Sequence, residues 1–119
     1  MMPKRILIAD DDQSHREIFA RFASIKGYDV VVVNDGFDLL KVAATERFDL
    51  IVTDLSMPDL DGASATEIMK LQDGATPVIA LTAYSPKEID LVQNTFNKIF
   101  HKPCDYTELF EYVESLIGK

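Results

Sequence analysis

Short apolar runs alternate along the chain with longer segments in which apolar residues recur every three or four positions. The runs are rich in β-branched residues and lie at Arg5–Ala9, Asp29–Val33, Leu50–Thr53, Pro77–Leu81 and Lys98–Phe100. The first four are nearly continuous in apolar residues, which predicts strands covered on both faces of a sheet. The fifth run has the weakest strand pattern.

The longer segments predict helices. In the first, Ile18, Phe22 and Ile25 are spaced for one helical face, and Lys26-Gly27 is a C-terminal stop. The second helix is expected around Leu39, Leu40, Val42 and Ala43. The third would carry Ile68, Met69 and Leu71, with a possible capping box from Ser64 to Glu67.

Two further helices have clear N-terminal signals. Ser85 to Glu88 gives an N-cap, a proline at the first helical position and a glutamate at the third. That helix would carry Ile89, Val92 and Phe96. Asp105 and Glu108 similarly open a last helix, whose apolar residues are Leu109, Val113, Leu116 and Ile117.

Strand and helix thus alternate five times, which predicts a parallel sheet with helices on both faces. Right-handed crossovers leave few ways to wind such a chain. We expect an α/β fold of the flavodoxin-like type: a doubly wound (βα)5 three-layer sandwich with strand order 2-1-3-4-5. Residues 1–119 are expected to form one domain.

Composition narrows the possible partners and the compartment. The chain of 119 residues has a formal net charge of −8, and its basic residues are scattered. This argues against a surface for nucleic acid or anionic membranes. The single cysteine, Cys104, rules out an internal disulfide framework and fits a reducing, cytoplasmic location. The N-terminus carries no signal peptide pattern, and no apolar stretch approaches the length of a membrane span.

Polar residues gather at the expected carboxyl ends of the strands. Asp10, Asp11 and Asp12 follow the first strand, and Asp54 follows the third. Because the first and third strands are neighbours in this order, we expect Asp10, Asp11 and Asp54 to converge at one edge of the sheet. Carboxylates held so close repel each other unless a cation neutralises them. Oxygen-only ligands favour Mg²⁺ or a similar hard ion.

Two more residues complete a candidate reaction site. Thr82 ends the fourth strand, and Lys102 follows the fifth. Lys102 would place a positive charge on the far side of the acids, and Thr82 a hydroxyl. This set suits phosphoryl transfer, in which metal and lysine neutralise phosphoryl oxygens while a nucleophile attacks in line. Asp54 is the candidate nucleophile.

Four segments in the same order and spacing resemble the receiver domain of two-component response regulators, including its stand-alone, chemotaxis-regulator-like members. They are "ILIADD", "IVTDLSMPDLDG", "PVIALTA" and "HKP", and the resemblance covers the whole chain. It implies that Asp54 accepts a phosphoryl group from a sensor histidine kinase or a histidine phosphotransferase. Asp10 and Asp11 match the acids that hold Mg²⁺ (or Mn²⁺) together with Asp54, and the backbone carbonyl of Ser56 matches the remaining protein ligand.

The resemblance also assigns the switching residues. Thr82 matches a hydroxyl that turns toward the phosphoryl group, and Lys102 matches the lysine that pairs with it, before a bond to Pro103 that is commonly cis. Ile99 stands where the family has a switching aromatic residue. Ser56 and Tyr84 match the two positions that tune the lifetime of the phosphoryl group.

A second departure from the family precedes the fifth strand, where "NTFNK" replaces a glycine-containing approach. We expect phosphorylation to survive both changes and the form of the output switch to differ. The output itself is expected to be a contact with a downstream protein. Its expected surface presents Ile99, His101 and the helix that begins at Asp105, whereas kinases are expected to dock on the first helix, with His15, Ile18 and Phe19.

Other functions on the same fold are less well supported. An aspartate-dependent phosphatase would place its nucleophile and acid after the first strand and would need a lid, for which no loop is long enough. A flavin-binding module would need a phosphate loop after the first strand, where three aspartates would repel it. A phosphorylatable switch is the favoured interpretation.

The remaining polar residues have structural interpretations. Asp12 is expected to be the N-cap of the first helix. Asp59 and Asp61 are expected to be turn residues. His15 is expected to face solvent rather than to relay a phosphoryl group, and His101 to lie at a surface strand end. Cys104 is expected to fill space before the last helix.

Overall fold

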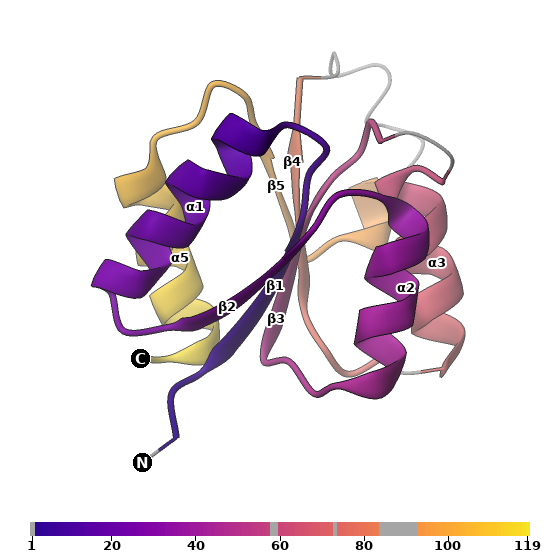
Figure 1. Ribbon diagram of the computed structural model, residues 1–119, viewed down its shortest axis with the longest axis horizontal. Coiled ribbons are helices and arrows are strands. Elements are labelled where there is room, and N and C mark those ends of the chain that lie inside the picture. Colours follow the sequence, from indigo (N-terminus) through magenta and orange to yellow (C-terminus); the bar gives the residue numbers. More distant parts are fainter. Residues whose placement is uncertain (1, 58–59, 73, 84–92) are drawn as a thin grey trace.

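A computed structural model describes residues 2–57, 60–72, 74–83 and 93–119 of the chain (Figure 1). Its five-stranded sheet is parallel and has the order β2-β1-β3-β4-β5. The strands are β1 (Arg5–Ala9), β2 (Asp29–Val33), β3 (Leu50–Asp54), β4 (Val78–Thr82) and β5 (Lys98–His101). The predicted strand order is confirmed, and each strand lies within one residue of its expected range.

Helices cover both faces of this sheet, so the fold is the expected three-layer sandwich. Helices α1 (Gln13–Ile25) and α5 (Tyr106–Ile117) lie on one face, and α2 (Gly36–Thr45) and α3 (Gly62–Gln72) on the other (Figure 1). A short 3₁₀ helix, η1 (Gln93–Thr95), precedes β5. Most of the helix expected from Ser85 lies outside the described residues; Phe96, its last expected apolar residue, directly follows η1 and is buried. Among the helices that are described, none has the length and apolar character needed to cross a membrane.

The alternation of side chains along each strand creates two cores. In β1, Ile6 and Ile8 point toward α1 and α5, whereas Leu7 and Ala9 point toward α2 and α3. On the first face, the ring of Phe19 packs 5.1 Å from that of Phe110, which joins α1 to α5. Both cores are needed to bury a parallel sheet on both faces.

The expectation that the first four strands are covered on both faces is wrong for β2. Strands β1, β3 and β4 are buried along almost their whole length, but β2 leaves Asp29 and Val32 exposed. The reason is its place at the edge of the sheet, where only β1 adjoins it. A run of valines therefore did not distinguish an edge strand from a central one.

The apolar faces of two helices also differ from those expected. Ile18 and Ile25 of α1 are 43% and 77% exposed, and the residues buried there are Phe19 and Ala23. In α3, Leu71 is 87% exposed, and the buried residues are Gly62, Ala65, Thr66 and Met69. Two other expected residues, Phe22 and Met69, do pack in the core. Both helices carry apolar residues on more than one side, so spacing alone identified the buried face only in part.

Helix ends follow the sequence signals, with one exception. Asp12 caps α1 by accepting a hydrogen bond from the backbone N–H of His15, and Asp105 caps α5, both as predicted. Gly27 takes a positive φ of 90° directly after the C-cap of α1. The predicted capping box at Ser64 is wrong, because α3 begins earlier and the carboxylate of Asp61 accepts the Ser64 N–H.

Candidate functional site

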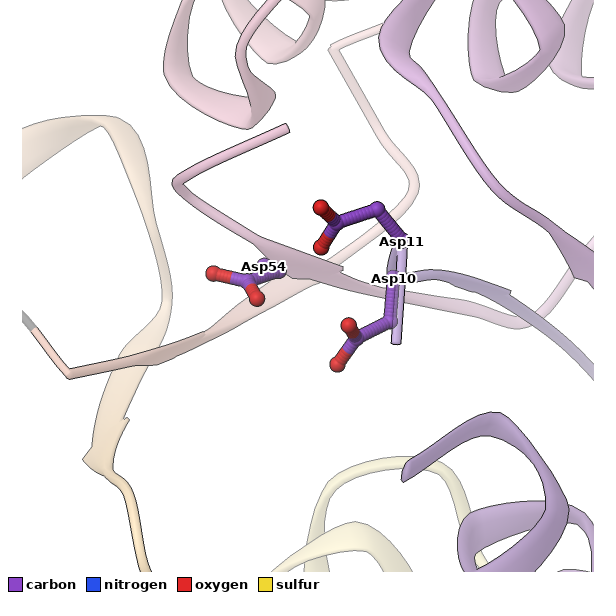
Figure 2. A group of neighbouring side chains, drawn as sticks. All are labelled: Asp10, Asp11 and Asp54. Carbon is purple, nitrogen blue, oxygen red and sulfur yellow. The ribbon is translucent and has the colours of Figure 1, made fainter. Parts of the chain in front are cut away.

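Three carboxylates meet at the carboxyl edge of the sheet. Asp54 is the last residue of β3, and Asp10 and Asp11 directly follow β1, the strand beside it. One oxygen from each of these three side chains lies within 4.8 Å of the others. Figure 2 shows the three carboxyl groups directed into the same space. The convergence predicted from the strand order is therefore confirmed.

Asp10 is more buried and makes more hydrogen bonds than an ordinary aspartate in an exposed loop. The residue is only 1% exposed, and its Oδ1 accepts a hydrogen bond from the backbone N–H of Asp12 at 2.9 Å. Its Oδ2 accepts one from Nζ of Lys102, also at 2.9 Å. The guanidinium of Arg16 donates to the backbone carbonyl of Asp10 at 2.7 Å. Arg16, which sequence reasoning missed, thus ties the first turn of α1 to the site.

The two carboxylate oxygens of Asp54 accept hydrogen bonds from different donors. Its Oδ1 accepts the backbone N–H of Ser56 at 3.0 Å, and its Oδ2 accepts Nζ of Lys102 at 2.7 Å. The residue is 8% exposed. The start of α3 lies against its backbone, because a Cβ placed on Gly62 would come within 2.0 Å of the Asp54 carbonyl oxygen. The packing of α3 therefore fixes the strand end that presents this carboxylate.

Lys102 provides the positive charge of the site and lies within it rather than on its far side. It bonds to both Asp10 and Asp54, and its side chain is 14% exposed. Its backbone N–H donates to the carbonyl of Thr82 at 2.7 Å, and its bond to Pro103 is cis, as expected from the family. Burial alone would lower the pKa of Lys102, but the hydrogen bonds that its ammonium donates to Asp54 and Asp10 outweigh burial and raise that pKa.

His15 belongs to the site, so the expectation that it faces solvent holds only in part. Its Nδ1 lies 3.0 Å from Nζ of Lys102 and 3.5 Å from Oδ2 of Asp10, and its side chain is 38% exposed. Sequence reasoning missed it because the contact joins residues 87 positions apart. The available signal was its place in the first turn of a helix that starts at the site.

A small cavity opens beside these groups. Its volume is about 330 Å³, and it is lined by Asp11, Asp12, His15, Asp54, Ser56, Ala83 and Lys102. A larger hollow, of about 1070 Å³, lies at the opposite edge of the sheet. Arg5 in its lining is paired with Asp29 and Glu46. The smaller cavity is the one bordered by Asp11, Asp54 and Lys102.

The other predicted residues take the following places. Thr82 is fully buried at the end of β4, where it stands opposite His101 in the register. Ile99 packs with the core under α2 and α3, whereas Phe100 packs with the opposite core, so the two point to opposite faces as expected. Tyr84 and Asp59 lie outside the described residues.

The remaining structural interpretations hold where the structure tests them. His101 is exposed on β5. Asp61 supports the turn before α3 through its bond to Ser64. Cys104 is partly buried against the core beside α5, where burial raises the pKa of its thiol. A raised pKa disfavours the reactive thiolate, which agrees with the space-filling interpretation.

The donor set fits a hard divalent cation. Asp10, Asp11 and Asp54 offer only carboxylate oxygens, the ligands that Mg²⁺ prefers, and no sulfur or imidazole is in their group. Two of the three acids are buried, where their mutual repulsion is large. These three residues would hold such an ion.

The fold and the site together define a class of protein. Its members are doubly wound α/β domains with an acidic, lysine-containing cleft at the carboxyl edge of the sheet. Within that class, the family model of the response regulator receiver domain matches residues 6–114. The chain therefore belongs to the response regulator receiver family of two-component systems, whose members are signalling switches rather than conventional enzymes.

Individual proteins agree with this assignment. The chain is 34% identical over 119 residues to the CAI-1 autoinducer sensor kinase/phosphatase CqsS of Vibrio cholerae, covering 96% of this chain and 17% of that protein. It is 29% identical to the polar-differentiation response regulator DivK of Brucella anthropi, with 98% of both chains covered. The chain spans less than a fifth of the first three curated relatives it matches, at 17%, 17% and 19% of their lengths.

A solved structure matches the fold closely. The receiver domain of sensor histidine kinase PA1611 from Pseudomonas aeruginosa PAO1 has a TM-score of 0.91 and 30% identity, covering 99% of this chain and all of that one. That crystal structure has a magnesium ion coordinated in its active site cleft.

Proposed function

We propose that Asp54 accepts a phosphoryl group from a phosphohistidine donor, which is a sensor histidine kinase or a histidine phosphotransferase. The observation that carries the proposal is the grouping of Asp54 with two further acids and one lysine at the carboxyl edge of the sheet. A carboxylate surrounded by other acids repels an incoming, negatively charged phosphoryl group unless nearby cations neutralise the charge. The site offers one cation in Lys102 and a donor set for another.

The chemistry follows from these placements. An oxygen of the Asp54 carboxylate attacks phosphorus, a new P–O bond forms, and the P–N bond of the donor breaks. The histidine keeps the electron pair and takes up a proton. Lys102, already 2.7 Å from Oδ2 of Asp54, neutralises charge on the incoming group. When bound, Mg²⁺ would neutralise the phosphoryl oxygens further.

Each protein group has an assigned part in this proposal. Asp10, Asp11 and Asp54 would hold the metal, with the backbone carbonyl of Ser56 as an additional ligand. Thr82 turns its hydroxyl toward the phosphoryl group once it is in place. The same groups support the later attack of water on the acyl phosphate, so the domain catalyses both its own phosphorylation and its own dephosphorylation.

The signal leaves the domain as a changed protein contact. Ile99 is proposed to take the place of the usual switching aromatic residue, and the surface around β5 and α5 to meet the downstream protein. Kinase docking is assigned to α1. Phe19 has no part in docking, because it is fully buried. Ile18, which is 43% exposed, remains available there.

Intact-mass spectrometry after incubation with Mg²⁺ and acetyl phosphate tests the proposal. We expect a single phosphoryl adduct that requires Mg²⁺ and is absent from Asp54→Asn. Asp61→Asn is the matched control, since it makes the same change at an exposed helix cap. No adduct with acetyl phosphate and none with a phosphorylated histidine donor would show that this receiver fold lacks the chemistry.

A further inference from the structure

The ammonium of Lys102 is surrounded by three acceptors. Oδ2 of Asp54 lies at 2.7 Å, Oδ2 of Asp10 at 2.9 Å and Nδ1 of His15 at 3.0 Å from Nζ. A lysine ammonium has three N–H donors and no lone pair. Each donor therefore has one acceptor, and Nδ1 of His15 has to be the acceptor in its contact. The ring proton of His15 accordingly resides on Nε2.

The three acceptors differ in whether they would also bind a metal ion. Asp10 and Asp54 belong to the group that would hold a metal, whereas His15 comes from α1 and does not. A cation bound to Asp10 competes with Lys102 for the same carboxylate. His15, as a neutral acceptor, adds no negative charge that would draw the metal or resist a phosphoryl group.

We propose that His15 is a positioning residue for Lys102. When a metal binds Asp10, His15 keeps the ammonium of Lys102 directed at Asp54. The N–H donors of Lys102 then have enough acceptors without the carboxylate of Asp10. This inference rests on the proposed function of the site. It assigns to His15 no contact with the phosphoryl group, because its effect passes through Lys102.

The same geometry disfavours a phosphoryl relay through His15. A nucleophilic ring nitrogen needs a free lone pair. The lone pair of Nδ1 is engaged by Lys102, and Nε2 carries the proton. The hydrogen bond that makes His15 useful to Lys102 thus removes it as an acceptor of phosphoryl groups.

Two substitutions separate hydrogen bonding from packing. His15→Leu keeps bulk and loses the acceptor, whereas His15→Gln keeps an acceptor oxygen. With acetyl phosphate, we expect the phosphorylation rate of His15→Leu to fall roughly tenfold, as for a lost hydrogen bond to a charged group. Its Mg²⁺ affinity, measured by calorimetry, should fall as well, because Lys102 then holds Asp10 more firmly. His15→Gln should recover most of both.

Gln13→Leu is the matched control, since Gln13 is an exposed residue in the same turn of α1 and bonds only to Glu17 among the described residues. It should leave the rate and the Mg²⁺ affinity unchanged. Equal values for His15→Leu and wild type in both measurements would overturn the proposal. So would a His15→Gln variant as impaired as His15→Leu.

Nuclear magnetic resonance provides a readout that needs no phosphorylation. At a pH where the imidazole is neutral, long-range ¹H–¹⁵N spectra should show His15 as the Nε2–H tautomer. Its Nδ1 signal should move in Lys102→Met, while that of the exposed His101 stays in place. An Nδ1–H tautomer, or an unmoved His15 signal, contradicts the proposal. If wild type takes up no phosphoryl group, the proposed function fails, and these spectra together with the Mg²⁺ titration still decide the role of His15.

Discussion

Nζ of Lys102 lies 2.7 Å from Oδ2 of Asp54, and this ion pair joins the ends of β5 and β3 across the acidic site. The same ammonium also neutralises Asp10, which is 1% exposed. Two buried carboxylates therefore share one cation. Lys102 thus contributes to the stability of the domain as well as to the proposed chemistry.

Removing this cation should destabilise the domain in a metal-dependent way. Lys102→Met leaves the acids uncompensated, and we expect the free energy of unfolding to fall by about 3 kcal/mol without divalent ions. Added Mg²⁺ should restore much of the loss, because it binds only the folded cluster. Urea unfolding with chelator and with Mg²⁺ measures both values. A loss that Mg²⁺ leaves unchanged would mean that the metal does not compensate the same charges.

The pH dependence of this stabilisation has a definite sign. The pKa of Lys102 is raised above 10.5 in the folded domain, so folding favours the protonated ammonium. Its stabilising contribution is therefore complete below the ordinary lysine pKa and is lost as the pH rises through the raised value. The difference in unfolding free energy between wild type and Lys102→Met should accordingly stay level and then shrink in alkaline buffer. A difference that grows with pH would contradict the assignment.

The three consecutive aspartates should respond differently to substitution. Asp11→Asn removes the exposed one of the three proposed metal ligands, so Mg²⁺ affinity should fall by at least the roughly 10–100-fold that losing a residue supporting a ligand costs, with no loss of thermal stability. Asp12→Ala removes the N-cap of α1, so the melting temperature should drop while Mg²⁺ still binds. Asp12→Asn, which can still cap, is the control for the second variant.

Acid titration offers an independent check on Asp12. The backbone N–H of His15 lowers the pKa of the Asp12 carboxyl. The cap therefore stabilises the fold above the ordinary aspartate pKa and is lost as the pH falls through the lowered value. The melting temperatures of wild type and Asp12→Ala should thus converge in strong acid.

The positions of the strands and acids were predictable because they depend on local pattern and on one topological rule. Continuous β-branched runs mark the strands, and the ends of neighbouring parallel strands share an edge of the sheet. That rule alone brings Asp54 to Asp10. The helix faces were less predictable, because Ile18 and Phe19 are both apolar and only the packing against α5 decides which is buried.

His15 and Arg16 show what a single sequence does not reveal. Nothing near His15 in the chain indicates a partner 87 residues away. The Arg16 bond to a backbone carbonyl leaves no residue pattern at all. Such contacts depend on how the first turn of α1 is directed over the site, and periodicity does not encode that direction. The predicted roles of Ser56, Thr82, Tyr84 and Ile99 remain predictions.

The approach of α3 to Asp54 gives a last test of how packing supports the site. Gly62 begins α3, its N–H donates to the carbonyl of Leu55, and a Cβ there would lie 2.0 Å from the Asp54 carbonyl oxygen. Gly62→Ala should therefore push α3 away from the end of β3 and cost about 3 kcal/mol of unfolding free energy. Phosphorylation should slow as well, because the displaced backbone carries the acceptor.

Gly74→Ala is the matched control for this substitution. The nearest atom to an added Cβ at Gly74 is the Lys70 carbonyl oxygen at 3.7 Å, an ordinary contact distance. Because alanine restricts the unfolded chain, this variant should be unchanged or more stable by about 0.5 kcal/mol. The test compares the two variants by their unfolding free energies in urea and by their phosphorylation rates. Equal tolerance of alanine at both glycines would show that the contact between α3 and Asp54 is not what holds the acceptor in place.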